Sequence, residues 1–185
     1  GEALLGWGGV GEHAVGAGAA LAAVVVEQHG LADAGEFGEQ FTHGHLQAGA
    51  VGFILPDLPV EEAGELHALA AAADLAPIVL MTPTSTDARL QTLGGAARGF
   101  VYVVARKGVT GSSTAMNEDV TRLLDRCRAA TQLPLALGFG VASREDIAFI
   151  AEHADIAIIG TAALRAWEDA GEQGLRTFFA GLELL

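Results

Sequence analysis

The sequence predicts an α/β fold organised around a parallel sheet, and two observations support that prediction. From residue 51 onward, short apolar runs rich in β-branched residues alternate with amphipathic segments. The runs are 51–57, 77–83, 100–105, 134–140 and 156–162. They are apolar throughout rather than alternating, which indicates strands buried on both faces, as in parallel sheets. Five successive strand–helix units are compatible with a closed barrel and with an open doubly wound sheet.

The segments between these runs carry helix-start signals. Residues 60–73 are predicted to form a helix with Glu61 and Glu62 in its first turn, where the helix dipole favours anions. Asn117 and Ser143 are predicted to cap the helices that follow the third and fourth runs. The expected inward faces are Val120, Leu123, Leu124 and Cys127 in the first of these helices, and Ile147, Ile150 and Ala151 in the second.

The first 50 residues have a weaker pattern. Segments 3–7 and 20–28 are predicted strands, and Phe37 and Phe41, four residues apart, suggest a short helix that leads into the first apolar run. No sharp linker divides the sequence, so residues 1–185 are expected to form a single barrel-like domain.

Length and composition narrow the choice of architecture. A closed eight-unit (β/α) barrel usually needs about 250 residues, whereas this chain has 185, so a barrel here would be shortened or partial. The hydrophobic fraction of 51% is sufficient for a packed core. The longest uncharged apolar run, 14–26, is shorter than the roughly 18 residues that a membrane-spanning helix requires.

The charge balance restricts the partners that the chain can bind. The sequence contains ten Lys and Arg residues and 23 Asp and Glu residues, which gives a net charge of −13. Every Lys and Arg lies at or after Arg89. Such a surface would repel nucleic acid and anionic membranes, so neither is an expected partner. Cys127 is the single cysteine, which excludes a disulfide framework and a cysteine-built zinc site. A soluble cytoplasmic protein is expected.

Glycine-containing segments follow three of the predicted strands, at 108–112, 138–140 and 160–162. Glycine at the carboxyl end of a strand lets the backbone approach a ligand, and a helix that opens there adds the positive end of its dipole. Each segment alone is also explained as an ordinary turn. Because all three lie in the last three units, together they favour a phosphate-binding cradle that needs no cation.

Acidic residues lie at two predicted strand ends. Asp57 follows the run 51–57 between two prolines and could be catalytic, cap the next helix or contact a partner. Glu27 and Asp33 could bring two carboxylates to one strand mouth, and the simpler interpretation is that both are exposed loop acids. The six histidines show no metal-binding spacing, so no metal site is expected. Trp167 is expected to be a packing residue.

Four segments carry a resemblance to a known family. They read AGAVGFILPDLPVEE (48–62), GFVYVVARKGVTGSSTA (99–115), LPLALGFGVAS (133–143) and ADIAIIGTAAL (154–164). In order and spacing they resemble the tryptophan synthase alpha subunit family, over about residues 48–182. The resemblance implies a (β/α)8 TIM-type barrel, shortened on its N-terminal side, that cleaves indole-3-glycerol phosphate to indole and glyceraldehyde 3-phosphate. It also implies a heterotetramer with a beta subunit, which holds pyridoxal phosphate, and no cofactor in this chain.

The same resemblance implies roles for individual residues. Those matching the family's phosphate site are Gly111, Gly140, Gly160 and Thr161. Those matching residues around the indole ring and the catalytic glutamate are Phe139 and Tyr102. Thr110 matches a threonine of the mobile loop that closes the site, and Asp57 matches an aspartate that faces the beta subunit.

The N-terminal third departs from the family pattern. The family's acid loop, roughly PFSDPxADGP, is absent, and no room remains before Phe41 for a second helix and third strand. Asp33 matches the family's aspartate, whereas its catalytic glutamate corresponds to Ala23 or, if the strand register shifts, to Glu27. The chain is then a remodelled relative, or it lacks residues of the natural protein. Two alternatives to the lyase follow: a non-catalytic partial barrel that binds phosphate or the beta subunit, and another phosphate-sugar barrel enzyme.

Overall fold

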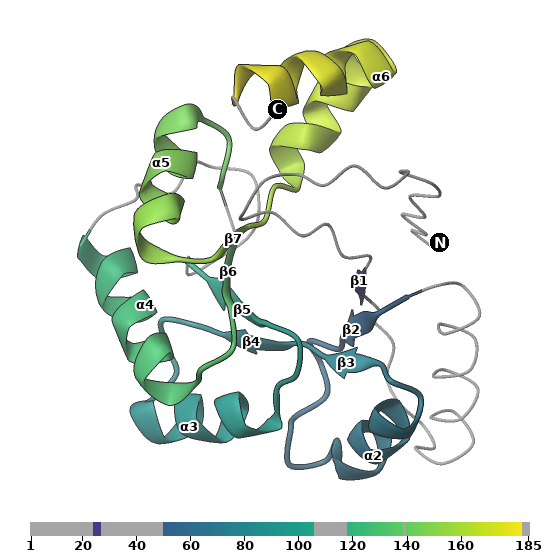
Figure 1. The fold of residues 1–185 in the computed structure, drawn as a ribbon, viewed down its shortest axis with the longest axis vertical. Helices are drawn as coiled ribbons and strands as arrows, with labels where there is room; N and C mark the ends of the chain where they lie inside the picture. Colours follow the sequence, from purple (N-terminus) through teal and green to yellow (C-terminus); the bar gives the residue numbers. More distant parts are fainter. Residues whose placement is uncertain (1–23, 27–49, 106–117, 139, 183–185) are drawn as a thin grey trace.

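The computed structural model describes residues 24–26, 50–105, 118–138 and 140–182. Strands and helices alternate along these residues, as the sequence predicts (Figure 1). The strands are β1 (Val24–Val26), β2 (Gly52–Ile54), β3 (Ala76–Pro77), β4 (Val79–Met81), β5 (Val101–Val104), β6 (Leu135–Gly138) and β7 (Ile156–Ala157). The helices are α2 (Gly64–Ala72), α3 (Asp87–Ala96), α4 (Glu118–Ala130), α5 (Arg144–His153) and α6 (Thr161–Gly181).

All the paired strands are parallel and follow one another in chain order. One sheet has the order β1-β2-β3 and the other the order β4-β5-β6-β7. Only Ile78 separates β3 from β4, and its N–H donates to the carbonyl of Phe53 on β2 at 2.9 Å. The two sheets are therefore one curved surface that changes hydrogen-bonding partner at Ile78, with α2, α3, α4 and α5 on its outside (Figure 1).

Two apolar clusters hold the helices on these strands. The larger one joins β4, β5 and β6 to α3, α4 and α5, and includes Met81, Leu90, Val103, Leu124, Cys127 and Leu137. The smaller one packs α2 on β2 and includes Phe53, Leu66, Ala70 and Leu75. Strands β5 and β6 contribute residues from both faces to the buried set, as parallel strands between two layers do.

The helices confirm part of the predicted pattern. On α4 the buried residues are Val120, Leu123, Leu124 and Cys127. Ser143 caps α5 in a reciprocal capping box, in which its hydroxyl accepts the Asp146 N–H and the Asp146 carboxylate accepts the Ser143 N–H. Ile150 is buried on α5. The prediction for Ala151 is wrong, because this residue faces solvent.

Two further predictions need correction. Helix α2 begins at Gly64 rather than near residue 60, so Glu61 and Glu62 precede it and Glu65 is the acid of its first turn. The Glu62 N–H donates to the carbonyl of Pro59 at 2.9 Å, which makes a separate turn ahead of the helix. Trp167 is 52% exposed on α6 and is not a packing residue in this structure. The predicted cap Asn117, strand 3–7, and Phe37 and Phe41 lie outside the described residues.

The last helix is two helical segments joined at a break. Ala170 and Gly171 have non-helical dihedrals, and Gly171 has φ +59°, a conformation that favours glycine. Beyond the break, Gly174 lies so close to the carbonyl oxygen of Ala166 that a side chain at position 174 would collide with it. None of the described helices combines the length and apolar character needed to cross a bilayer.

Candidate active site

Tyr102 of β5 lies against Gly138, the last residue of β6. The strand register pairs Tyr102 with Ala136, and Val104 with Gly138. A Cβ atom built on Gly138 would lie 2.6 Å from Cε1 of the Tyr102 ring and would also collide with its hydroxyl oxygen. The absence of a side chain at Gly138 therefore creates the space that the phenol fills. Burial raises the pKa of Tyr102, so this phenol stays protonated at neutral pH and can both donate and accept a hydrogen bond.

The loop after β6 has a backbone shape that requires glycine. Gly140 has φ +106°, which L residues rarely adopt. Two residues later the chain enters the α5 cap, where the N–H groups of Ala142 and Ser143 both donate to Asp146 Oδ2 at 2.9 Å. The N–H groups of Ala142 and Ser143 are thus already bound by a carboxylate of the same helix, so these two amides do not form an anion site.

The start of α6 is different. Its N-cap is Gly160, which makes no side-chain capping hydrogen bond, and its first residue, Thr161, is exposed. A Cβ atom at Gly160 would meet nothing within 4 Å. A helix N-terminus of this kind presents unpaired N–H groups and the positive end of the dipole, and the Thr161 hydroxyl adds a donor. Of the two helix starts that follow β6 and β7, the α6 start is the one suited to bind an anion.

Asp57 occupies a separate loop, after β2. It is exposed and does not cap α2, whose N-cap is Ala63, so the capping alternative is excluded. Beside it lies a cavity of about 270 Å³ between α2 and α3, whose wall includes Asp57, His67, Ser85 and Arg89. Burial lowers the pKa of His67, so its imidazole is neutral at physiological pH.

The structure tests the remaining predicted site residues unequally. Glu27, Asp33, Thr110, Gly111 and Phe139 lie outside the described residues. Strand β1 is the described segment that precedes Glu27 and Asp33 in the sequence. It pairs in parallel with β2, from Val24 opposite Gly52 to Val26 opposite Ile54. The carboxyl ends of these two strands therefore lie side by side.

The described residues give no metal-binding cluster and no activated thiol. They contain no group of three or more His, Cys, Asp or Glu side chains placed to hold a metal ion. Cys127 is fully buried on α4, and burial raises its pKa to about 11. A thiol with that pKa is not a nucleophile at neutral pH.

Sequence reasoning missed two features near the site. In the sequence, Gly138 is simply the first glycine of the GFG segment. Only the strand register shows that its lack of a side chain makes room for Tyr102. The ion pair between Glu61 and Arg89 joins residues 28 positions apart, and nothing in the sequence pairs them. A glycine opposite an aromatic residue on a neighbouring predicted strand is the signal that could have revealed the first feature.

Comparisons with known proteins agree with this architecture. A family model described as tryptophan synthase alpha chain matches residues 34–180. The tryptophan synthase alpha chain of Desulfotalea psychrophila is 43% identical over 144 residues, which cover 78% of this chain and 57% of that protein. The same figures hold for the alpha chain of Syntrophotalea carbinolica. The chain thus spans a little over half the length of these relatives.

Solved structures extend the match to three dimensions. The structure of Mycobacterium tuberculosis tryptophan synthase superposes with a TM-score of 0.71 at 34% identity, covering 80% of this chain and 57% of the other. A tryptophan synthase from Pyrococcus furiosus gives a TM-score of 0.73 at 24% identity, covering 88% and 65%. The parallel strands and outer helices are therefore a shortened (β/α)8 TIM-type barrel. The chain belongs to the tryptophan synthase alpha chain family.

Proposed function

We propose that this chain is an alpha-type lyase of tryptophan biosynthesis that cleaves indole-3-glycerol phosphate to indole and glyceraldehyde 3-phosphate. The observation that carries the proposal is the 43% identity over 144 residues to proteins named tryptophan synthase alpha chain. The geometry supports it in two ways. The protonated phenol of Tyr102 on β5 packs against Gly138, the last residue of β6, and an uncapped helix start follows β7, which pairs with β6 on its other side. Barrel enzymes bind their substrates at the carboxyl ends of such strands.

The substrate phosphate is proposed to bind at the start of α6. There the backbone of Gly160 and the hydroxyl of Thr161 would donate to phosphate oxygens, helped by the helix dipole. Gly140, whose positive φ shapes the preceding loop, and Gly111 are proposed to complete the cradle. A site built from backbone donors suits a chain with 23 acidic and only ten basic residues.

The reaction itself is a retro-aldol cleavage and needs three groups. An acid protonates indole C3 as its bond to the glycerol carbon breaks, a carboxylate accepts the indole N–H, and a base removes the proton from the glycerol hydroxyl, which becomes the aldehyde. Glu27 is proposed as the acid and Asp33 as the partner of the indole nitrogen. Tyr102 and Phe139 are proposed to contact the ring, and Thr110 to help close the site. This chemistry requires no cofactor in this chain.

The proposed partner is a tryptophan synthase beta subunit, which would hold pyridoxal phosphate and consume the indole in a cytoplasmic heterotetramer. Asp57 is exposed at the end of β2, where a second subunit can reach it. Residues 1–185 are proposed to act together as a single domain.

Calorimetric titration with glycerol phosphate, combined with an assay of glyceraldehyde 3-phosphate formation from indole-3-glycerol phosphate, tests the proposal. The lyase binds the phosphate and turns the substrate over. Binding without turnover would instead identify a non-catalytic relative, and no binding would contradict the proposed cradle.

A further inference from the structure

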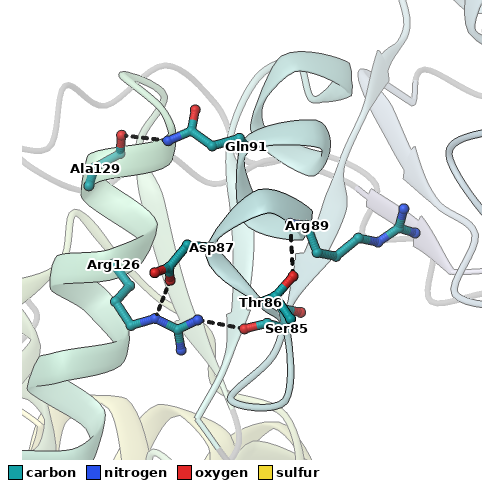
Figure 2. A network of polar contacts seen from close by, with 7 residues as sticks. All are labelled: Ser85, Thr86, Asp87, Arg89, Gln91, Arg126 and Ala129. Atoms are coloured by element: carbon teal, nitrogen blue, oxygen red, sulfur yellow. Dashed lines mark hydrogen bonds and ion pairs between the residues drawn. The ribbon is translucent and has the colours of Figure 1, made fainter.

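Two arginines on neighbouring helices connect the loops at the carboxyl ends of β2 and β4. Arg126 of α4 reaches the segment that precedes and begins α3 (Figure 2). Its Nε donates to Asp87 Oδ1 at 2.7 Å, and its Nη2 donates to the carbonyl oxygen of Ser85 at 2.6 Å. One guanidinium therefore fixes both the last loop residues and the first turn of α3.

Arg89 extends from the same helix turn toward the other side. In Figure 2 its side chain points away from Arg126. Its Nη1 pairs with Oε1 of Glu61, a residue outside that view, in the segment between β2 and α2. The backbone at Arg89 is itself held, because its N–H donates to the N-cap hydroxyl of Thr86 at 3.2 Å. The arginine thus works from a capped, anchored helix start.

The segment that Arg89 reaches is the one that carries Asp57. Within it, the Leu58 N–H donates to Leu55 O at 3.4 Å and the Glu62 N–H to Pro59 O at 2.9 Å, and both bonds are local. The cavity of about 270 Å³ separates part of this segment from the α3 side, since Asp57 and Leu58 line one wall and Ser85 another. Val60 of this segment packs against the larger apolar cluster, and Leu55 and Leu58 pack against the smaller one. The cavity leaves this apolar packing incomplete, so the Glu61–Arg89 ion pair adds a second contact that holds the segment against α3.

We propose that Arg89 and Glu61 are positioning residues that hold the Asp57 segment at a fixed place relative to α3, so that Asp57 is presented to the beta subunit. This inference rests on the proposed function, because the subunit is the proposed partner. The segment that carries Asp57, Glu61 and Glu62 is then held by Arg89, the first cation of the chain. Arg126 acts one step further away, by holding the helix start from which Arg89 extends.

The expected effect is modest, because both side chains are partly exposed, at 36% for Arg89 and 55% for Glu61. A single solvent-exposed ion pair contributes little free energy, and salt screens its charges. We expect Arg89→Met and Glu61→Gln each to weaken binding of the cognate beta subunit about two- to fivefold at low salt. The double variant should be no weaker than either single variant, and the difference from the unmodified chain should shrink in about 1 M salt.

Matched variants separate positioning from loss of charge. Arg122→Met removes an arginine whose ion pairs, within the described part of the chain, are with Glu118 and Asp119 of its own helix. Glu62→Gln removes the acid next to Glu61. Neither should change beta-subunit affinity as much as the test variants, and Arg89→Lys, which keeps the charge, should restore most of the binding.

A second readout does not depend on the partner. Amide hydrogen exchange of residues 55–62 in the isolated chain should be faster in Arg89→Met than in the unmodified chain or Arg122→Met. Unchanged exchange together with affinities equal to those of the controls would overturn the positioning role alone. If the unmodified chain fails to bind the beta subunit, the proposed partner is wrong, and the assignment of Asp57 to that interface falls with it.

Discussion

The phenol of Tyr102 occupies the space that a side chain at Gly138 would need. A Cβ atom at Gly138 would approach Cε1 and Cζ of the ring to 2.6 Å, closer than real Cβ contacts come. Both residues lie on the two central strands of the larger sheet, which are in register over four residue pairs. The tyrosine therefore keeps its position only while residue 138 is glycine.

The first prediction follows from this contact. Gly138→Ala should displace the Tyr102 ring and lower turnover of indole-3-glycerol phosphate about 10²-fold, because a misplacement of about 1 Å can cost that much. The measurement is steady-state indole release by protein whose fold is verified by circular dichroism. Gly95→Ala is the control, because a Cβ there meets nothing within 4 Å. Turnover equal to that of the control would show that Tyr102 takes no part in the reaction.

Two adjacent glycines of α3 should respond in opposite directions. A Cβ atom at Gly94 would lie 2.5 Å from the carbonyl oxygen of Ala130 on α4, so Gly94→Ala should lower the free energy of unfolding by about 1–3 kcal/mol. Gly95 is in open space, and alanine there should raise it by about 0.5–1 kcal/mol through helix propensity. Denaturant unfolding of both variants measures the difference. The same sign for both would contradict the close approach of α3 and α4.

The phosphate cradle can be tested with two side chains at position 140 that have nearly the same shape but differ in charge. Gly140→Asp would place a carboxylate near the phosphate, and two unit charges at about 4 Å repel by roughly 4 kcal/mol at an effective dielectric of 20. Because φ at this position is +106°, any side chain adds strain. Gly140→Asn carries the same strain without the charge and is the control. Glycerol phosphate should bind the Asp variant far more weakly than the Asn variant, and equal affinities would rule out a phosphate beside Gly140.

Asp155 should make folding stability depend on pH. Burial raises its pKa, but this effect is outweighed by hydrogen bonds from Arg128 Nη2 at 2.5 Å and the Leu135 N–H at 2.8 Å, so the net shift is downward from 3.8. A lowered folded pKa contributes stability above pH 3.8 that is lost as pH falls through the folded pKa. The carboxylate is half-exposed, so solvent screening limits the contribution to about 1 kcal/mol.

Thermal unfolding of Asp155→Asn between pH 7 and pH 2 checks this expectation. The variant should be less stable than the unmodified chain at pH 7, and the two should converge at the acidic end. A stability gap that stays constant over this range would show that the carboxylate charge does not stabilise the fold.

The regular part of the fold is predictable because its signals are local. Each of the five apolar runs contains at least one strand, and Ser143 caps α5 as its position before an acidic first turn indicates. The start of α2 is not predictable in this way. Glu61 and Glu62 resemble a helix start, but the Pro59 turn and a distant arginine determine their conformation.

The candidate site likewise has features that local sequence signals predict and features that depend on contacts between distant residues. Gly140 and Gly160 are marked in the sequence as glycines after strands, and the structure gives one a positive φ and the other an uncapped helix start. The sequence could not show that the Asp146 carboxylate already accepts the N–H groups of Ala142 and Ser143, because that depends on side-chain geometry. It also could not show that Tyr102 packs on Gly138, which requires the strand register.

Steady-state release of indole from indole-3-glycerol phosphate, with the beta subunit supplied, tests the central claim most directly. The unmodified chain should release indole above background, and Glu27→Gln should abolish release without changing glycerol phosphate affinity, since the phosphate cradle is built from other loops. Asp33→Asn should cost less, because an amide oxygen still accepts the indole N–H. Wild-type turnover in Glu27→Gln would remove Glu27 from the mechanism. No release by the unmodified chain would contradict the assignment of lyase activity.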